Sequence, residues 1–521
     1  MPPLQLKWRD YKYFPYERDF ALRETRSLIG ARLRASPSDV RVTAPSATRE
    51  ALDRLTYFAR AILPGGAVVV PRQARIEASA AVSKRQGTRY SAHGLHEYRG
   101  RYNPQVVSAI ANILGLPRDA HVLDPFAGSG TTLLECLHIG LSATGIDRNP
   151  LAQMIAAAKL RSMRLADGRL EEYATAITRM VSSATCDITG HDPVSKRAIE
   201  KALGPSWKDD LTDPDYLLSW FPVGVLAQTV AISRCIRRVV SRPSDRLVFH
   251  VVLSDLLREA SYQDPRDLRI RRRKDCPVNV PLGGKYVDAV HDRIGRITRA
   301  RAVLGRIGGQ QSAIHGDARQ VLGRKVHRQQ PPEYDAVITS PPYETALPYV
   351  DTQRLSLVLL GLVGPSQIAS EERALIGSRE IGTTERRELE SAIDRNTAGL
   401  PRTLIALCRD LRNAAGRGGD GFRRRARPAL VYRYFVEMGD FFRALRPNVK
   451  KSAPVAMVVG CNRTTLGGVD FEIETPMLLC QLARKHGFEE EARIPMDTYP
   501  RYDMHQRNAI AAEELIILRA C

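Results

Sequence analysis

The sequence lacks the features of a membrane protein and of a protein built around metal ions or disulfides. No apolar run approaches the roughly 20 residues of a membrane-spanning helix, and the N-terminus has no apolar segment like that of a secretory signal. The eight cysteines are scattered, with no CxxC pair and no clustering with histidines. This spacing argues against a zinc site and favours reduced thiols. We therefore expect a cytoplasmic protein without a metal site or a membrane partner.

Acidic residues are too few to balance the basic ones. Lysine and arginine number 78 against 57 aspartates and glutamates, so the formal net charge is +21. A protein so basic usually meets a polyanion, most often nucleic acid, and a uniformly solvated basic surface is the alternative. With 521 residues, 43% of them hydrophobic, the chain is long enough for roughly two to four domains, or for one domain with large insertions.

Residues 121–147 show the pattern of a strand, a glycine-rich turn, a helix and a second strand. The turn reads Asp124-Pro125-Phe126-Ala127-Gly128-Ser129-Gly130-Thr131-Thr132. Glycines allow the backbone to approach a ligand closely, and the following helix presents its N-terminus there. The second strand ends at Asp147, where a carboxylate can accept hydrogen bonds from a ribose diol. The unit predicts a site for a nucleotide-type cofactor.

A buried strand predicted at 336–338 ends in two prolines, within Thr339-Ser340-Pro341-Pro342-Tyr343. Two prolines cannot continue a strand ladder, so the chain must leave the sheet with a rigid backbone. In open α/β sheets this carboxyl edge is where ligands bind. Another predicted strand, at 312–316, ends at Asp317, which is either a ligand-binding acid or a turn-capping one.

Together these motifs resemble those of the S-adenosylmethionine-dependent amino methyltransferases of DNA, which methylate the exocyclic nitrogen of cytosine or adenine. The glycine-rich turn is similar to their cofactor motif, and residues 339–343 are similar to their catalytic motif in its serine form. The loop at 93–105 resembles their third cofactor-contacting segment. The resemblance covers roughly 91–160, 312–350 and, more loosely, 430–521. It implies an α/β fold: a Rossmann-like methyltransferase sheet with largely helical insertions.

The resemblance implies a role for each matched residue. The Ser340 side chain and the Pro341 carbonyl would accept hydrogen bonds from the target amino group, and Tyr343 would stack on the base; Pro342 completes the rigid motif. Asp147 would bind the ribose hydroxyls of S-adenosylmethionine and Asp317 its adenine amino group. The other expected cofactor-binding residues are Tyr102, Asn103, Pro104, Asp124, Pro125, Phe126, Ala127, Gly128, Ser129, Gly130, Thr131 and Thr132. The target base would be flipped out of the DNA duplex to reach this pocket.

The residue types also narrow the reaction. Methylation of cytosine carbon 5 needs a thiolate, supplied in that family by a Pro-Cys dipeptide, and no cysteine here follows a proline. The serine form of the catalytic motif favours N4 of cytosine over N6 of adenine. Two further functions stay open, an RNA amino methyltransferase of the guanosine-N2 type and a non-catalytic module that binds S-adenosylmethionine. For a DNA enzyme we expect a restriction-modification or other defence system, with a nuclease or another defence protein as a partner.

We expect the chain to divide into six regions. They are 1–90, an N-terminal arm or small domain; 91–160, the cofactor-binding part; 161–311, a basic helical insertion; 312–351, the active-site part; 352–427, a second helical and basic segment; and 428–521, the closing strands. Both 161–311 and 352–427 are candidate target-recognition regions. The expected nucleic-acid contacts are Arg269, Arg271, Arg272, Arg273, Lys274, Arg423, Arg424 and Arg425.

Overall fold

The computed structural model describes most of the chain. The residues outside the description are 1–2, 31, 44–46, 79–85, 99, 101, 189–195, 265–266, 268–269, 275–279, 328–332, 345–347, 417–420 and 498–512. Among the expected nucleic-acid contacts, Arg269 lies outside the described residues. Within the described part, no helix has both the length and the apolar character needed to cross a membrane.

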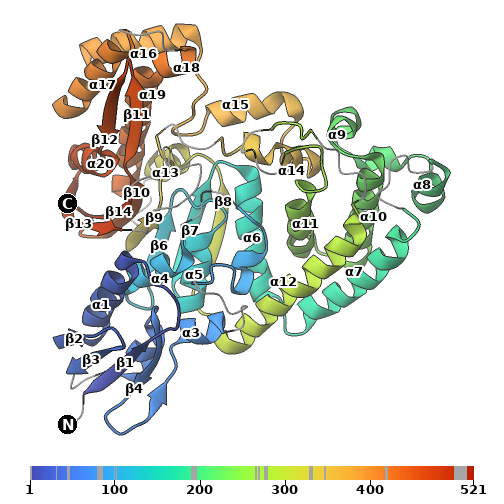
Figure 1. The fold of residues 1–521 in the computed structure, drawn as a ribbon, viewed down its shortest axis with the longest axis horizontal. Coiled ribbons are helices and arrows are strands. Elements are labelled where there is room, and N and C mark those ends of the chain that lie inside the picture. Colours follow the sequence, from blue (N-terminus) through green and yellow to red (C-terminus); the bar gives the residue numbers. More distant parts are fainter. Residues whose placement is uncertain are drawn as a thin grey trace.

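A seven-stranded sheet forms the centre of the molecule, in the order β13-β14-β10-β9-β6-β7-β8 (Figure 1). The strands are β6 (His121–Asp124), β7 (Ser142–Asp147), β8 (Gln311–His315), β9 (Ala336–Thr339), β10 (Pro454–Gly460), β13 (Phe488–Met496) and β14 (Glu513–Ala520). Strands β6 to β10 pair in parallel, and β14 runs antiparallel to both of its neighbours. This mostly parallel sheet within a largely helical chain confirms the predicted α/β, Rossmann-like fold class.

Alternate residues of the central strands face two hydrophobic cores, because successive side chains of a strand point to opposite faces. Val122 belongs to the core shared with α4 (Pro104–Ile113), α5 (Thr131–Ile139) and α6 (Pro150–Arg164). Leu123 belongs to the core shared with α13 (Ala318–His327), α19 (Arg427–Leu445) and α20 (Thr475–Arg484). Both faces are covered, which explains why these strands read as continuous apolar runs.

The first insertion connects α6 to β8 and is helical. Its helices are α7 (Arg169–Thr185), α8 (Lys196–Leu203), α9 (Pro214–Trp220), α10 (Val223–Val239), α11 (Pro243–Leu257) and α12 (Leu282–Leu304). Helix α11 packs against α6, and α12 packs against α7 and α11. The two ends of the insertion meet, since the Arg164 guanidinium at the end of α6 donates to the Gly309 carbonyl at 2.7 Å. The insertion therefore leaves and rejoins the sheet at one place.

The second insertion connects β9 to β10. It holds α14 (Arg354–Leu359), α15 (Ile368–Arg373), α16 (Thr383–Arg395), α17 (Arg402–Ala415) and α18 (Phe422–Arg425), and it ends at α19. Helix α14 packs against α9 and α11 of the first insertion, whereas α16 and α17 pack against α19. Beyond it, β11 (Asn462–Leu466) and β12 (Val469–Ile473) form a separate hairpin.

The N-terminal region forms a second sheet, of five antiparallel strands in the order β2-β3-β1-β4-β5. Its elements are β1 (Leu4–Trp8), α1 (Pro15–Ile29), β2 (Arg32–Ala35), β3 (Asp39–Thr43), α2 (Arg49–Arg54), β4 (Phe58–Ile62), β5 (Val68–Val69) and α3 (Arg72–Glu77). Helix α1 packs against α4, which joins this unit to the central sheet (Figure 1).

Candidate cofactor and substrate pocket

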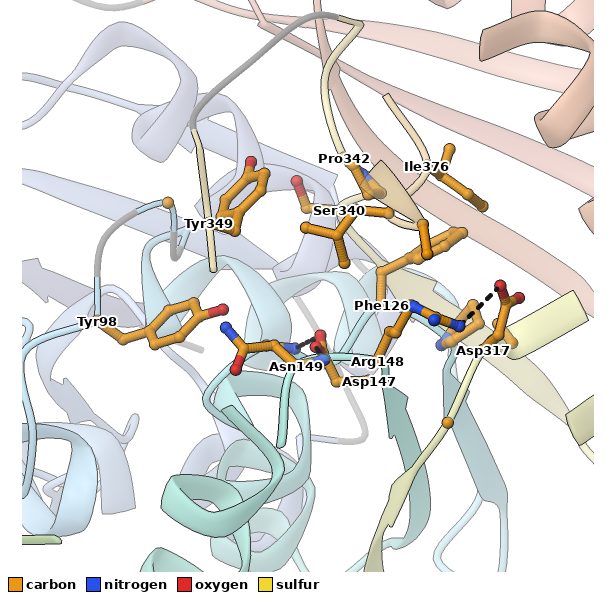
Figure 2. Close-up of a pocket in the computed structure, with 17 residues that line it drawn as sticks. Tyr98, Phe126, Asp147, Arg148, Asn149, Asp317, Ser340, Pro342, Tyr349 and Ile376 are labelled. Atoms are coloured by element: carbon orange, nitrogen blue, oxygen red, sulfur yellow. Dashed lines mark hydrogen bonds and ion pairs between the residues drawn. The ribbon is translucent and has the colours of Figure 1, made fainter. Parts of the chain in front are cut away.

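The carboxyl ends of β6, β7, β8 and β9 surround one pocket (Figure 2). The expected site residues that line it are Pro125, Phe126, Gly128, Asp147, Asp317, Ser340 and Pro342. The lining residues that sequence reasoning missed are Tyr98, Gly100, Arg148, Asn149, Gly316, Ala318, Tyr349, Ala374, Leu375 and Ile376. The pocket therefore brings the glycine-rich turn and the double-proline segment together, under residues of the second insertion.

The glycine-rich turn needs its glycines for two reasons. Gly128 and Gly130 have left-handed backbones, with φ of +49° and +78°. A Cβ atom on Gly130 would also stand 2.7 Å from the Cβ of Ala156 in α6, closer than side chains pack. The turn is thus held tightly against α6, and α5 begins directly after it at Thr131. This geometry presents the Gly128 backbone to the pocket.

The Asp147 carboxylate at the end of β7 is held by backbone groups. One oxygen accepts from the N–H of Gly128 at 2.7 Å, and the other accepts from the N–H of Asn149 at 2.8 Å (Figure 2). Burial raises the pKa of Asp147 to about 6, although both hydrogen bonds favour the ionised form. At neutral pH Asp147 is therefore a fixed hydrogen-bond acceptor that lines the pocket.

Asp124 does not line the pocket but connects two of its walls. Its Oδ1 accepts from the Thr339 hydroxyl at 2.6 Å and from the N–H of Phe126 at 3.1 Å, so it joins the end of β9 to the start of the turn. Burial raises the pKa of Asp124 to about 6. Ala127, Ser129, Gly130, Thr131 and Thr132 are likewise buried behind the pocket surface.

The loop before α4 divides into pocket-lining and supporting residues. Tyr98 and Gly100 line the pocket. Tyr102 instead hydrogen-bonds the Thr132 hydroxyl. Asn103 caps α4 by accepting from the N–H of Gln105 at 3.1 Å, and Pro104 is the first residue of that helix. The expected triplet of Tyr102, Asn103 and Pro104 therefore frames the site, and its neighbours reach the pocket.

Asp317 caps a turn and also lines the pocket. Its Oδ1 accepts from the N–H of Arg319 at 2.9 Å at the start of α13, as a turn-capping aspartate does, and it also lines the pocket. Burial opposes its ionisation, but the Arg319 guanidinium, 2.6 Å from Oδ2, outweighs burial and holds the pKa of Asp317 below its usual value. Arg148 adds a second, weaker ion pair at 3.8 Å (Figure 2).

The double-proline segment leaves β9 as a fixed loop. Ser340 and Pro342 line the pocket, and Pro341 between them is buried. The Tyr343 hydroxyl donates to Glu513 Oε1 at the start of β14, at 2.7 Å. Burial, strengthened by the nearby Glu513 carboxylate, raises the pKa of Tyr343 well above its usual value, so the phenol stays neutral. This segment is therefore positioned partly by a residue far along the chain.

A buried ion pair fixes the next residue. The Glu344 carboxylate has no exposed surface and lies 2.6 Å from the guanidinium of Arg427, the first residue of α19. Gly377 packs against the same segment: its φ is +75°, and a Cβ atom there would stand 2.6 Å from the Tyr343 carbonyl oxygen. Gly377 and the start of α19 thus hold the C-terminal end of the double-proline segment.

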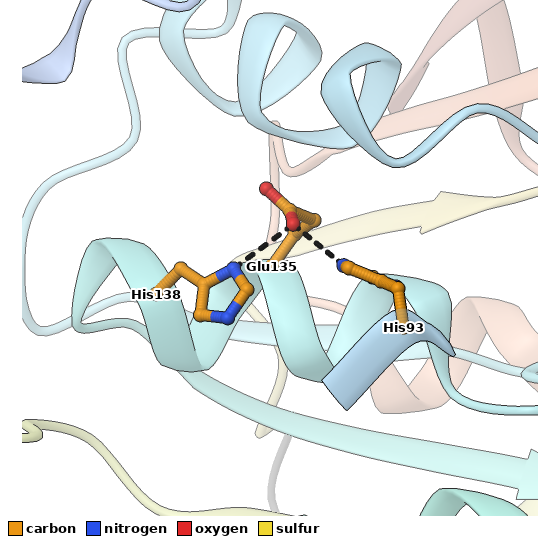
Figure 3. Close-up of side chains that lie close together, drawn as sticks. All are labelled: His93, Glu135 and His138. Atoms are coloured by element: carbon orange, nitrogen blue, oxygen red, sulfur yellow. Dashed lines mark hydrogen bonds and ion pairs between the residues drawn. The ribbon is translucent and has the colours of Figure 1, made fainter. Parts of the chain in front are cut away.

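His93, Glu135 and His138 form a buried cluster behind the turn (Figure 3). One oxygen of Glu135 bonds His93 Nε2 at 2.8 Å, His138 Nδ1 at 3.0 Å and the Tyr90 hydroxyl at 2.7 Å. Burial lowers the pKa of His93 to about 3, and the two histidines hold the pKa of Glu135 low against the effect of burial. The spacing would also admit a metal ion, but these hydrogen bonds satisfy the carboxylate without one. The cluster ties the loop before α4 to α5.

The basic residues of the first insertion follow Ile270, which approaches the segment after Tyr349. The N–H of Ile270 approaches the Asp351 carboxylate at 3.5 Å, two residues from Tyr349. Arg272 lies over Trp220 and Tyr262, with 5.2 and 5.7 Å to the ring centroids. Arg273 donates to the carbonyls of Gln263 and Glu259. Arg271 pairs with Asp267, and Lys274 is exposed. Arg423, Arg424 and Arg425 are exposed on α18.

Comparison with known proteins agrees with the resemblance of the motifs. The sequence is 38% identical over 84 residues to the type II methyltransferase M.MjaII of Methanocaldococcus jannaschii, which is 15% of each chain. It is 24% identical over 289 residues to the type II methyltransferase M.MvaI of Kocuria varians, covering 53% of this chain and 59% of that one. The matches thus span less than two thirds of either relative. No protein-family model matches the sequence.

Proposed function

We propose that the protein transfers a methyl group from S-adenosylmethionine to an exocyclic amino nitrogen of a base in DNA, N4 of cytosine in preference to N6 of adenine. The observation that carries this proposal is that Ser340 and Pro342 line the same pocket as Gly128 and Asp147. A site for a nucleoside cofactor and a site for a planar amino group then share one cavity. The similarity to two type II methyltransferases supports DNA as the substrate.

The pocket residues fit S-adenosylmethionine, which supplies an activated methyl group when bound. The Asp147 carboxylate suits a ribose diol, and the Gly128 backbone suits close approach of the methionine part. Phe126 and Ile376 offer apolar walls for a planar ring, with Asp317 at the same end of the pocket (Figure 2). The cofactor role of these residues is part of the proposal.

The double-proline segment suits an exocyclic amino group. The lone pair of the amino nitrogen is delocalised into the base. The enzyme must therefore accept hydrogen bonds from the amino group and orient its nitrogen toward the methyl donor. The Ser340 hydroxyl and the Pro341 carbonyl supply acceptors on a backbone that the prolines hold rigid. The bond between Asp124 and Thr339 fixes this segment relative to the glycine-rich turn. Tyr343 would stack on the base, which must leave the duplex to enter the pocket.

The experiment is to express the protein in a host without DNA methylation and to sequence the genomic DNA with a modification-sensitive method. We expect N4-methylcytosine in one short sequence motif. Detection of N6-methyladenine instead would show that adenine, and not cytosine, is the target base. Unmodified DNA together with methylated RNA would overturn the proposal. The Ser340→Ala variant should leave the DNA unmodified, whereas Ser241→Ala, at an exposed serine outside the pocket, should not.

A sequence-specific pattern would also support a place in a restriction-modification or other defence system, working in the cytoplasm. In that setting the partner would be a nuclease or another defence protein. Co-expression of the neighbouring genes with the Ser340→Ala variant tests this part: loss of host viability only when methylation is absent is the expected result. Unchanged viability would remove the nuclease from the proposal and leave the methyltransferase activity as it stands.

A further inference from the structure

The outer face of the N-terminal sheet carries a row of basic side chains. In β1 and β3, apolar residues point inward and the intervening residues point outward, for example in β1, where Leu4 and Leu6 are buried. The outward residues of β1 to β4 include Lys7, Arg32, Arg34, Arg41 and Arg60, and all four arginines are exposed. We call these five residues the basic face. They come from strands that are far apart in sequence, so the sequence alone does not reveal the row.

The strand register places like charges directly opposite one another. Arg34 on β2 pairs with Arg41 on β3, and Lys7 on β1 pairs with Arg60 on β4. Like charges in directly opposed positions destabilise a sheet. Asp39 is the one acidic residue in these four strands, and it is already bound to the Lys7 ammonium at 2.8 Å. The arrangement therefore lowers stability unless something else supplies negative charge.

The spacing suits an extended anion. Opposed residues on neighbouring strands lie about 5 Å apart, and residues two apart on one strand lie about 7 Å apart. Several cations thus fall within one Debye length of about 10 Å at moderate salt, where their fields add. Because they stand on a sheet and not on a loop, the backbone keeps them in place before the anion arrives. A uniformly solvated surface would need neither the alignment nor the scarcity of acids in these strands.

The basic face points away from the catalytic pocket. Helix α1 covers the inner face of the N-terminal sheet, with Phe20 and Ala21 buried, and it packs against α4 on its other side. The sheet lies at the lower left of Figure 1, beneath α1, while the pocket opens at the carboxyl ends of the central strands. Changes to the basic face can therefore be made without touching a residue of the pocket.

We infer that the basic face binds the phosphate backbone of duplex DNA, as a second contact that is independent of sequence. This inference rests on the proposed function, which makes DNA the polyanion that the protein meets. The contact holds the enzyme on DNA through charge alone, while the pocket and the insertions select the base. It also gives a role to the N-terminal region, which contains neither the glycine-rich turn nor the double-proline segment.

The test is the quadruple variant Arg32→Gln, Arg34→Gln, Arg41→Gln and Arg60→Gln. Its affinity for a labelled random-sequence DNA duplex is measured over a range of salt concentrations. We expect at least a tenfold loss of affinity at low salt and a salt slope smaller by about 3.6, because each of the four phosphate contacts contributes about 0.9 to the slope. The methyl-transfer rate at saturating DNA and the affinity for S-adenosylmethionine should stay the same.

The matched control removes four exposed arginines elsewhere. It carries Arg23→Gln, Arg26→Gln, Arg443→Gln and Arg484→Gln, all outside the pocket, the two insertions and the basic face, so its net charge equals that of the test variant. An equal loss of affinity in both variants would show an effect of net charge alone and would overturn the inference. So would unchanged affinity in the test variant. If the basic face prefers single-stranded RNA, and only RNA affinity falls, the assignment to duplex DNA is wrong.

A smaller variant guards against misfolding and gives a second readout. Arg34→Gln with Arg41→Gln removes a repulsive pair, so the melting temperature should rise by a few degrees while DNA binding weakens. If Arg34 and Arg41 served only to stabilise the fold, the melting temperature of this variant would fall. These outcomes are also separate from the proposed function: wild-type protein that methylates no nucleic acid would refute that proposal, whereas this test measures binding.

Discussion

The two halves of the pocket are held in place by different kinds of contact. On the proposed cofactor side, the carboxylate of Asp147 bonds backbone groups of Gly128 and Asn149, which lie within 19 residues of it. On the proposed target side, Tyr343 bonds Glu513, which lies 170 residues away, and Glu344 pairs with Arg427 of α19. One half is a local unit of strand, turn and strand; the other exists only when distant parts of the chain have assembled.

This difference explains how variants should behave. The cofactor half depends on backbone groups, so single side-chain changes there should weaken one ligand contact without loosening the fold. The target half depends on buried side-chain pairs, so a change in a distant helix should disturb both stability and methyl transfer. The following variants sharpen or break this contrast, from the largest expected effect to the smallest.

Arg427→Met should have the largest effect. It removes the guanidinium that pairs with the buried Glu344 carboxylate, and breaking a buried ion pair in this way costs about 3 to 5 kcal/mol of unfolding free energy. Urea unfolding measures the change, and methyl transfer should fall with it. Arg443→Met is the control, because its pair with Asp440 is exposed and should contribute less than about 1 kcal/mol. Equal stability of the two variants would refute the proposed dependence on distant contacts.

Ser340→Ala should lower the rate of methyl transfer by about 10² to 10³, the usual effect of removing one preorganised polar group from a reaction site. The dissociation constant of S-adenosylmethionine, measured by calorimetry, should stay unchanged, because Ser340 belongs to the target half. A large loss of cofactor affinity in this variant would show that the two halves are not separable in the way the contacts indicate.

Asp147→Asn should weaken S-adenosylmethionine binding by about 10 to 100-fold, the loss expected for a hydrogen bond to a charged group. The pKa of Asp147 is about 6, so in the wild type the carboxylate becomes protonated and affinity should fall as pH drops below that value. The variant should lose most of this pH dependence, with a remainder from Asp124. Asp119→Asn, at an exposed carboxylate, should bind the cofactor as the wild type does at every pH.

Tyr343→Phe should have the smallest effect. It removes only the hydrogen bond to Glu513, worth about 1 kcal/mol, so transfer should slow several-fold while stacking remains. Glu513→Met should act similarly, because it removes the acceptor. Because both changes break the same contact, the double variant should be little worse than either single one. Additive losses would mean that Glu513 acts on the site by another route.

Sequence reasoning predicted the sheet and the pocket residues that belong to it, because their signals are local. Apolar runs bounded by glycine or proline mark β6 and β9, and each strand ends at a residue that reaches the carboxyl edge of the sheet. The fold class and the neighbourhood of Asp147, Ser340 and Asp317 follow from these patterns. The roles of individual residues in binding and transfer stay predictions.

One part of the pocket lining had no signal in the sequence. Ile376 lies between α15 and α16 and reaches the pocket only because the second insertion folds back over it, and Tyr349 belongs to no motif of the predicted active-site part. Other lining residues adjoin expected ones: Arg148 and Asn149 follow Asp147, Gly316 and Ala318 flank Asp317, and Tyr98 and Gly100 lie in the expected loop 93–105. The sequence also did not predict the five-stranded N-terminal sheet, because helices separate its paired strands along the chain.

The closure of the first insertion by Arg164 has a practical consequence for redesign. A block that leaves and rejoins the sheet at a single closed junction can be exchanged as a cassette, provided that its packing against α6 and α14 is kept. Chimeras cut at this junction could carry the block of one such protein on the sheet of another. If target choice resides in the block, its exchange would transfer the recognised sequence while the chemistry stays with the host framework.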